Sequence, residues 1–156
     1  MPRKFLVVVD DSPEFEAALR YASRRARSTG GRVALLRVIP PAASDAHWAG
    51  VREEIERQTR AEAETLLNGW AEQAHQRSGE MPVLLIERGE PQAAIRKVVG
   101  EDNEIKILVL AAGEGSRGAG PLVTAVLKQG AAFTGRKLPV TIVPGELTEQ
   151  DIEDLA

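Results

Sequence analysis

A glycine-rich loop at residues 113–120 is the part of this sequence best suited to bind a phosphate. The apolar run IKILVLAA at 105–112 leads directly into GEGSRGAG, which contains four glycines. A buried parallel strand that ends in a glycine-rich turn before a helix commonly presents backbone N–H groups to a phosphate. The same loop could also be only a flexible connection. Its role therefore depends on whether the rest of the chain builds a ligand site around it.

Several side chains in and near this loop could contact such a ligand. Gly115, Ser116 and Gly118 make a Gly-x-x-Gly phrase, in which the glycines allow close approach of the backbone. Arg117 and Lys128 are the candidate phosphate contacts, and the alternative is that both are solvated. Ser116 is not a candidate hydrolase nucleophile, because no Gly-x-Ser-x-Gly elbow surrounds it.

Composition excludes several other kinds of chemistry. The chain has no cysteine and only two histidines, His47 and His75, which are far apart in the sequence. Disulfides and thiolate ligands are therefore excluded, and we predict neither a metal site nor catalytic residues. The net charge of −3 argues against binding to nucleic acid or to an acidic membrane surface.

The 156 residues suit one globular domain at 1–145 with a helical extension at 146–156. No stretch reaches the roughly 18 consecutive apolar residues of a membrane span, so we expect a soluble, cytoplasmic protein.

Strands and helices are predicted to alternate along the chain. Alternation of this kind indicates a three-layer α/β/α domain with a parallel sheet. Apolar, β-branched runs predict strands at 5–9, 33–39, 83–86, 105–112 and 140–143. Apolar residues at helical spacing predict helices after Ser12, at 51–76, at 91–99, at 121–129 and after Thr148.

Capping residues predict where several of these helices begin and end. Ser12 is the expected N-cap of the first helix, with Pro13 in its first position. Gly30 should end that helix, and Gly100 should end the helix at 91–99. The long helix could fray at Asn68-Gly69, and Asp151 should complete a capping box with Thr148.

Several phrases, in this order along the chain, resemble those of the universal stress protein family: VVVDDSPE at 7–14, ALLRVI at 34–39, ERGEPQAAI at 87–95, and ILVLAAGEGSRG at 107–118 followed by PVTIVPG. No single phrase is specific, but the ordered set is. The resemblance implies a five-stranded parallel sheet in the order 3-2-1-4-5. This is a Rossmann-like fold related to the adenine nucleotide α-hydrolase-like domains.

The resemblance also implies a ligand site. In that strand order, the loops after the first and fourth strands flank the crevice where open α/β sheets bind ligands. Asp10 corresponds to the family's acid that contacts the adenosine portion, and Val38 to the residue whose backbone meets the adenine. The alternative for Asp10 is that it only favours a helix N-terminus electrostatically.

The family's ATP-binding branch carries Gly-x-x-Gly, nine further residues, and then Gly-Ser or Gly-Thr. Here Lys128 and Gln129 stand at the final positions, and a shifted reading to Gly130 meets Ala131 in place of the hydroxyl residue. Glu114 adds a negative charge beside the proposed phosphate position.

These departures favour a homodimeric stress-response regulatory module that needs no cofactor and does not bind ATP tightly. The alternative is a protein that binds ATP, with Mg, or AMP, and that could be a slow ATPase. A third hypothesis is a subunit that docks a protein partner through its long polar helix. In the family the fifth strand pairs with its copy, so we predict a homodimer through Val140, Ile142 and Val143, with the tail at 146–156 at or near that interface.

Overall fold

The computed structural model describes residues 3–41, 49–115 and 118–156. Five parallel strands form one sheet in the order β3-β2-β1-β4-β5. The strands are β1 (Lys4–Val8), β2 (Arg32–Ile39), β3 (Val83–Arg88), β4 (Ile105–Ala112) and β5 (Val140–Pro144). The predicted fold class and strand order are therefore confirmed.

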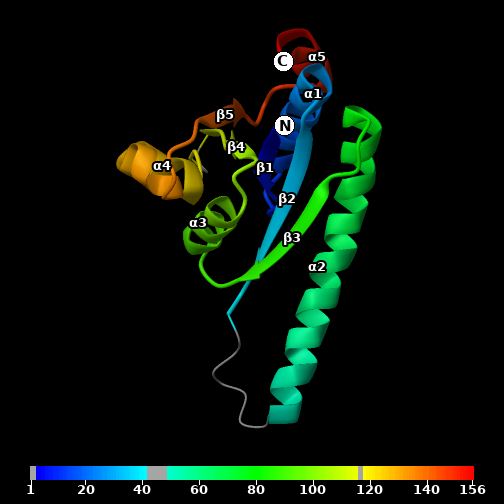
Figure 1. The fold of residues 1–156 in the computed structure, drawn as a ribbon, viewed down its shortest axis with the longest axis vertical. Helices are drawn as coiled ribbons and strands as arrows, with labels where there is room; N and C mark the ends of the chain where they lie inside the picture. The colour runs from blue at the N-terminus through cyan, green and yellow to red at the C-terminus, as the bar shows by residue number, and fades with distance from the viewer. Residues whose placement is uncertain (1–2, 42–48, 116–117) are drawn as a thin grey trace.

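Helices cover both faces of this sheet (Figure 1). Helices α1 and α2 pack on one face with the C-terminal helix α5, and α3, α4 and a 3₁₀ turn, η2, pack on the other. Their bounds are α1 (Phe15–Thr29), α2 (Ala49–Ser78), α3 (Pro91–Glu101), α4 (Pro121–Gln129), η2 (Gly130–Thr134) and α5 (Glu149–Leu155). No helix in the described part of the chain is long and apolar enough to cross a membrane.

The strands bury side chains on both faces, as a covered parallel sheet requires. In β1, Phe5 and Val7 belong to the core under α1 and α2, whereas Leu6 and Val8 belong to the core under α3 and α4. These four side chains of β1 are therefore removed from water, and their burial holds the sheet between the two helical layers.

Helix α1 begins later than the sequence indicates. Its N-cap is Glu14, which makes no side-chain capping hydrogen bond, so the prediction that Ser12 caps the helix is wrong. Ser12 is instead held by Asp10, whose carboxylate Oδ1 accepts hydrogen bonds from both the backbone N–H and the hydroxyl of Ser12. Gly30 ends the helix as predicted, at φ 69°.

Helix α3 runs through Gly100 to Glu101, so Gly100 does not end it as predicted. The Arg136 guanidinium replaces a glycine cap by donating to the carbonyls of Val99, Asp102 and Ile105. One of these acceptors, Val99, lies in the last turn of α3, where the helix itself leaves carbonyls unpaired, and the other two lie beyond the helix.

Helix α2 continues through Asn68-Gly69 without a break. Its C-terminal half is held by Leu67, Ala71 and Ala74, which are buried in the core. Its N-terminal half projects past the sheet (Figure 1), where Val51 and Ile55 remain exposed.

The last helix, α5, begins with the predicted capping box between Thr148 and Asp151. It packs against α1, and Ile152 is buried in the same core as α1 and α2.

Candidate functional site: the crevice at the ends of β1 and β4

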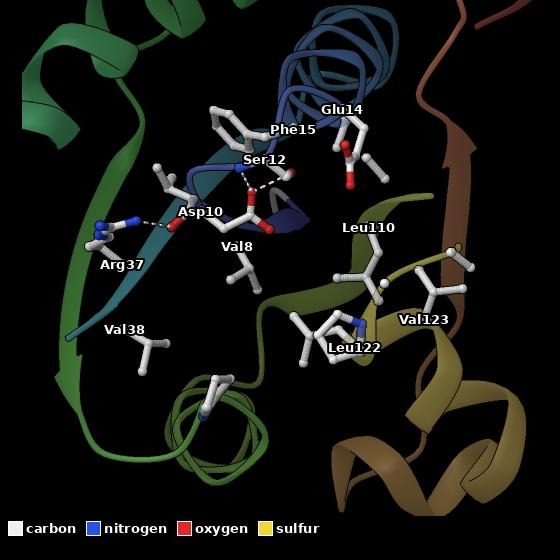
Figure 2. Close-up of a pocket in the computed structure, with 17 residues that line it drawn as sticks. Val8, Asp10, Ser12, Glu14, Phe15, Arg37, Val38, Leu110, Leu122 and Val123 are labelled. Atoms are coloured by element: carbon white, nitrogen blue, oxygen red, sulfur yellow. Dashed lines mark hydrogen bonds between the residues drawn. The ribbon is translucent and has the colours of Figure 1, made fainter. Parts of the chain in front are cut away.

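A cavity of about 240 Å³ opens at the carboxyl ends of β1 and β4, where the chain order of the sheet reverses. Open α/β sheets bind ligands at such a switch point. We call this cavity the crevice (Figure 2). It is lined by Val8, Val9, Asp10, Ser12, Glu14, Phe15, Ala18, Arg37, Val38, Pro91, Leu110, Ala111, Ala119, Gly120, Pro121, Leu122 and Val123.

Most of the crevice wall is apolar. Val8 and Leu110 come from the ends of the two central strands, and Leu122 comes from the first turn of α4. Phe15, at the start of α1, is backed by Trp70 of α2 in an edge-on contact with ring centroids 5.0 Å apart. Such a wall suits the apolar faces of a planar ring.

Asp10 supplies a carboxylate at the mouth of the crevice. Its Oδ1 accepts the Ser12 backbone N–H at 2.9 Å, which holds the carboxylate in a tight turn directly after β1. The side chain is exposed and lies at the centre of the ring of labelled residues in Figure 2. Val38 also lines the crevice, near the end of the neighbouring strand β2 (Figure 2). The structure thus brings together two of the predicted site residues.

Arg37 is a crevice residue that we did not select from the sequence. Its Nη1 donates to the Val9 carbonyl at 3.1 Å and lies 3.4 Å from an Asp11 carboxylate oxygen. Its Nε is buried and has no hydrogen-bond partner. A lone arginine in the apolar phrase ALLRVI, next to Val38, was a usable signal, because charged residues at the carboxyl end of a parallel strand face the ligand edge of the sheet.

The remaining predicted residues lie elsewhere. Gly115 and Gly118 are exposed in the loop beyond β4 and do not line the crevice. Lys128 is exposed in the last turn of α4 and does not line it either. Ser116 and Arg117 lie outside the described residues. Their proposed roles as phosphate contacts therefore stay predictions.

Two amides of the glycine loop are used within the loop itself. The Gly113 N–H donates to the Ala119 carbonyl at 3.2 Å, and the Gly118 N–H donates to the Gly115 carbonyl at 3.1 Å. A phosphate would have to replace these bonds to use either amide. The end of the loop does line the crevice, through Ala119 and Gly120. Gly120 has a φ of 100°, which a glycine adopts readily, and it leads the chain into α4.

Three glutamates gather where the loop after β4 meets the loop after β5. We call Glu14, Glu114 and Glu146 the acidic corner. Glu14 packs tightly against both loops, because a Cβ on Gly113 would lie 3.0 Å from its Oε1 and a Cβ on Gly145 would lie 2.4 Å from its Cβ. A hydrogen bond shared with the Glu114 carboxyl, together with its negative charge, raises the pKa of Glu146 above its ordinary value.

The described residues therefore build a binding site without an evident reactive group. Among them, no cluster of three His, Asp or Glu side chains could hold a metal ion. The crevice offers apolar walls for a ring, two carboxylates, Asp10 and Glu14, for hydroxyl or amino groups, and one guanidinium, that of Arg37.

Comparison with known proteins agrees with this architecture. Similar solved structures include the universal stress protein UspA from Lactobacillus plantarum, which is 20% identical with a TM-score of 0.70, over 90% of this chain and 97% of that one. A universal stress protein from Archaeoglobus fulgidus in complex with dAMP is 19% identical, with a TM-score of 0.58 over 90% and 97% of the two chains. A universal stress protein in complex with cAMP is 16% identical, with a TM-score of 0.59 over 92% and 98%.

At these identities the solved structures establish the fold alone. A search of curated proteins finds no match. The model of the universal stress protein family, however, matches residues 1–143, which is nearly the whole chain. The ordered phrases, the strand order with its crevice, and this match agree, and the chain belongs to the universal stress protein family.

Proposed function

We propose that this protein is a homodimeric regulatory module of the stress response, located in the cytoplasm, whose crevice binds the adenosine part of an AMP-type nucleotide and does not bind ATP tightly. The observation that carries the proposal is the crevice itself, which Asp10 and Val38 both line at the switch point of the sheet.

The shape and chemistry of the crevice support an adenosine ligand. Its apolar walls could hold the base, and the Asp10 carboxylate could accept hydrogen bonds from ribose hydroxyls. Two structural neighbours were solved with dAMP and with cAMP, so AMP-type nucleotides are the first ligands to try.

The acidic corner argues against a polyphosphate. Like charges a few ångströms apart repel even when partly screened, and ATP carries more negative charge than AMP. Two of the loop amides are also committed to hydrogen bonds within the loop. Lys128, the cation that could offset this charge, lies on the exposed end of α4.

The test is calorimetric titration with adenosine, AMP and ATP, with and without Mg²⁺, after removal of any nucleotide carried through purification. We expect AMP to bind at least ten-fold more tightly than ATP. Asp10→Asn should weaken AMP binding roughly ten-fold, since it removes a charge-assisted hydrogen bond.

Asp154→Asn is the matched control, because Asp154 does not line the crevice and its carboxylate accepts a hydrogen bond from Gln150 on the surface of α5. It should bind AMP as the wild type does. If the folded wild type shows no saturable binding of adenosine or AMP at millimolar concentration, the nucleotide proposal is wrong and a ligand-independent regulatory role remains.

A double variant, Glu114→Gln with Glu146→Gln, tests the acidic corner separately. We expect ATP to bind more tightly and uncharged adenosine to bind unchanged. Equal changes for both ligands would show that the corner acts on the shape of the crevice and not on ligand charge.

The homodimer proposal rests on the edge strand β5, which pairs with β4 along one side. Val143 is already buried within the single chain, so only Val140 and Ile142 of the three predicted residues offer side-chain surface to a partner. Ile142→Lys should convert a dimer to a monomer in sedimentation analysis, whereas Leu127→Lys, a similarly apolar but exposed residue of α4, should not.

A further inference from the structure

A second cavity, of about 210 Å³, lies between α1, the end of α2 and α5. We call it the arginine cavity, because four of its wall residues are arginines. Its lining residues are Arg20, Arg24, Arg27, Gln76, Arg77, Glu149, Ile152 and Glu153. It shares no lining residue with the crevice.

Three of the arginines come from one face of α1. Arg20, Arg24 and Arg27 recur at the three- and four-residue spacing that places side chains on one side of a helix. The opposite face of the same helix carries buried residues such as Leu19 and Ala22. Burial of that apolar face therefore orients the arginines outward, toward α5.

Helix α5 already places carboxylates against these arginines. Glu153 Oε1 lies 3.0 Å from Arg27 Nη2 and 3.3 Å from Arg24 Nε. Glu149 forms an ion pair with Arg77, and the hydrogen bond that Arg77 donates, together with the positive charges of Arg77 and Arg20, lowers the pKa of Glu149. The cavity thus already holds two carboxylates of the chain itself against its arginines.

The internal carboxylates do not use up the donors. Four arginines line the cavity with two glutamates, and Glu16, beside it, pairs with Arg20 at 3.0 Å. The Arg20 Nε is buried and makes no hydrogen bond, and the buried Arg24 Nε has only its 3.3 Å ion-pair contact with Glu153, which does not have hydrogen-bond geometry. Buried donors without acceptors are unusual in folded proteins, and an anion in the cavity could supply acceptors.

We propose that the arginine cavity binds a phosphate-bearing small anion. Several guanidinium groups that converge on one cavity provide forked donors that match phosphate oxygens. The anion competes with Glu153 for Arg24 and Arg27, so the position of α5 and the occupancy of the cavity are linked. This site is independent of the nucleotide proposal.

The probe is pyrophosphate. Its binding is measured by calorimetry and by the NMR signals of the arginine Nε–Hε groups. We expect saturable binding that shifts the Arg20 and Arg24 signals. Arg24→Gln should weaken binding roughly ten-fold, because it removes a charge-assisted donor. Arg27→Gln, at a more exposed position, is a second variant with less effect on folding and should weaken binding in the same direction.

Arg57→Gln is the matched control. It removes the same charge from α2, where Arg57 pairs with Glu54 and does not line the cavity. Glu153→Gln should strengthen binding several-fold, since it removes the competing carboxylate. The proposal fails if wild type does not bind millimolar pyrophosphate, if Arg57→Gln weakens binding as much as Arg24→Gln, or if the Arg20 and Arg24 signals do not move.

Discussion

The crevice and the arginine cavity both use α1, but they are built in different ways. The crevice takes its walls from strand ends and from the loops that follow them, and most of its lining is apolar. The arginine cavity takes its walls from the outer faces of three helices, and most of its lining is charged. The first follows from the topology of the sheet, whereas the second exists only because α5 folds back onto α1.

This difference predicts how each cavity can be broken. The corner of the crevice depends on close backbone packing at glycines, so an added methyl group should disturb it. The arginine cavity depends on the buried side chain of Ile152, which holds α5 in place, and on a set of ion pairs, so truncation of Ile152 should open it. The following predictions run from the largest expected effect to the smallest.

Gly145→Ala should have the largest effect. Its Cβ would lie 2.8 Å from the Ala112 carbonyl oxygen and 2.4 Å from Glu14 Cβ, so the backbone must shift. We expect a loss of about 3 kcal/mol in the free energy of unfolding by urea denaturation, the upper end for overpacking. Gly69→Ala is the control: its Cβ meets nothing within 4 Å, and it should stabilise helix α2 by up to about 1 kcal/mol. An unchanged free energy of unfolding in Gly145→Ala would mean that the corner is not tightly packed.

Ile152→Ala should have an intermediate effect. Ile152 is 3% exposed and anchors α5. Its truncation should lower the free energy of unfolding by about 2 kcal/mol, near the low end for a buried isoleucine because α5 can detach. Leu155→Ala, at a side chain 74% exposed on the same helix, should change stability by less than about 0.5 kcal/mol. Limited proteolysis should cut the tail of Ile152→Ala first. Equal protection in both variants would contradict an anchoring role.

Glu146→Gln should have the smallest effect, and one that depends on pH. Because the folded-state pKa of Glu146 is raised above 4.5, the folded protein binds more protons than the unfolded chain. Stability therefore falls as pH rises from 4.5 through the folded-state pKa, and the deficit persists at neutral pH. The variant should melt at a higher temperature than wild type at pH 7, with the difference vanishing below 4.5. Glu72→Gln, on an exposed position of α2, should show no such dependence. A difference independent of pH would contradict the shared proton with Glu114.

The sequence predicted the strands and the crevice better than it predicted the helix ends. Apolar runs located all five strands within one or two residues, because both faces of this sheet are covered and few polar residues interrupt the runs. Helix ends were less predictable where distant groups take part. The Ser12 hydroxyl, expected to cap α1, donates to Asp10 instead, and Arg136, far along the chain, binds carbonyls at the end of α3 beyond Gly100.

The site was predicted in part for the same reason. Asp10 comes just after β1 and Val38 lies near the end of β2, and the family resemblance, with the strand order that it implies, placed both at the crevice. Arg37 was missed because its role depends on the Val9 carbonyl and Asp11, which are contacts between neighbouring strands. The loop residues Gly115 and Gly118 were read from a motif, and the motif alone could not show that two loop amides bond within the loop.

The sequence by itself therefore determined the parallel sheet, because burial of apolar strands depends on local pattern, and its resemblance to the family implied the strand order and the place of the crevice. Only the tertiary structure decided the acidic corner and the arginine cavity. Glu14 is far from Glu146 in the chain, as Arg24 is from Glu153, and the sequence pattern carries little information on such pairs. They meet because α5 and the loop before it pack against α1, driven by the burial of Ile152 and the fit of two glycines around one glutamate.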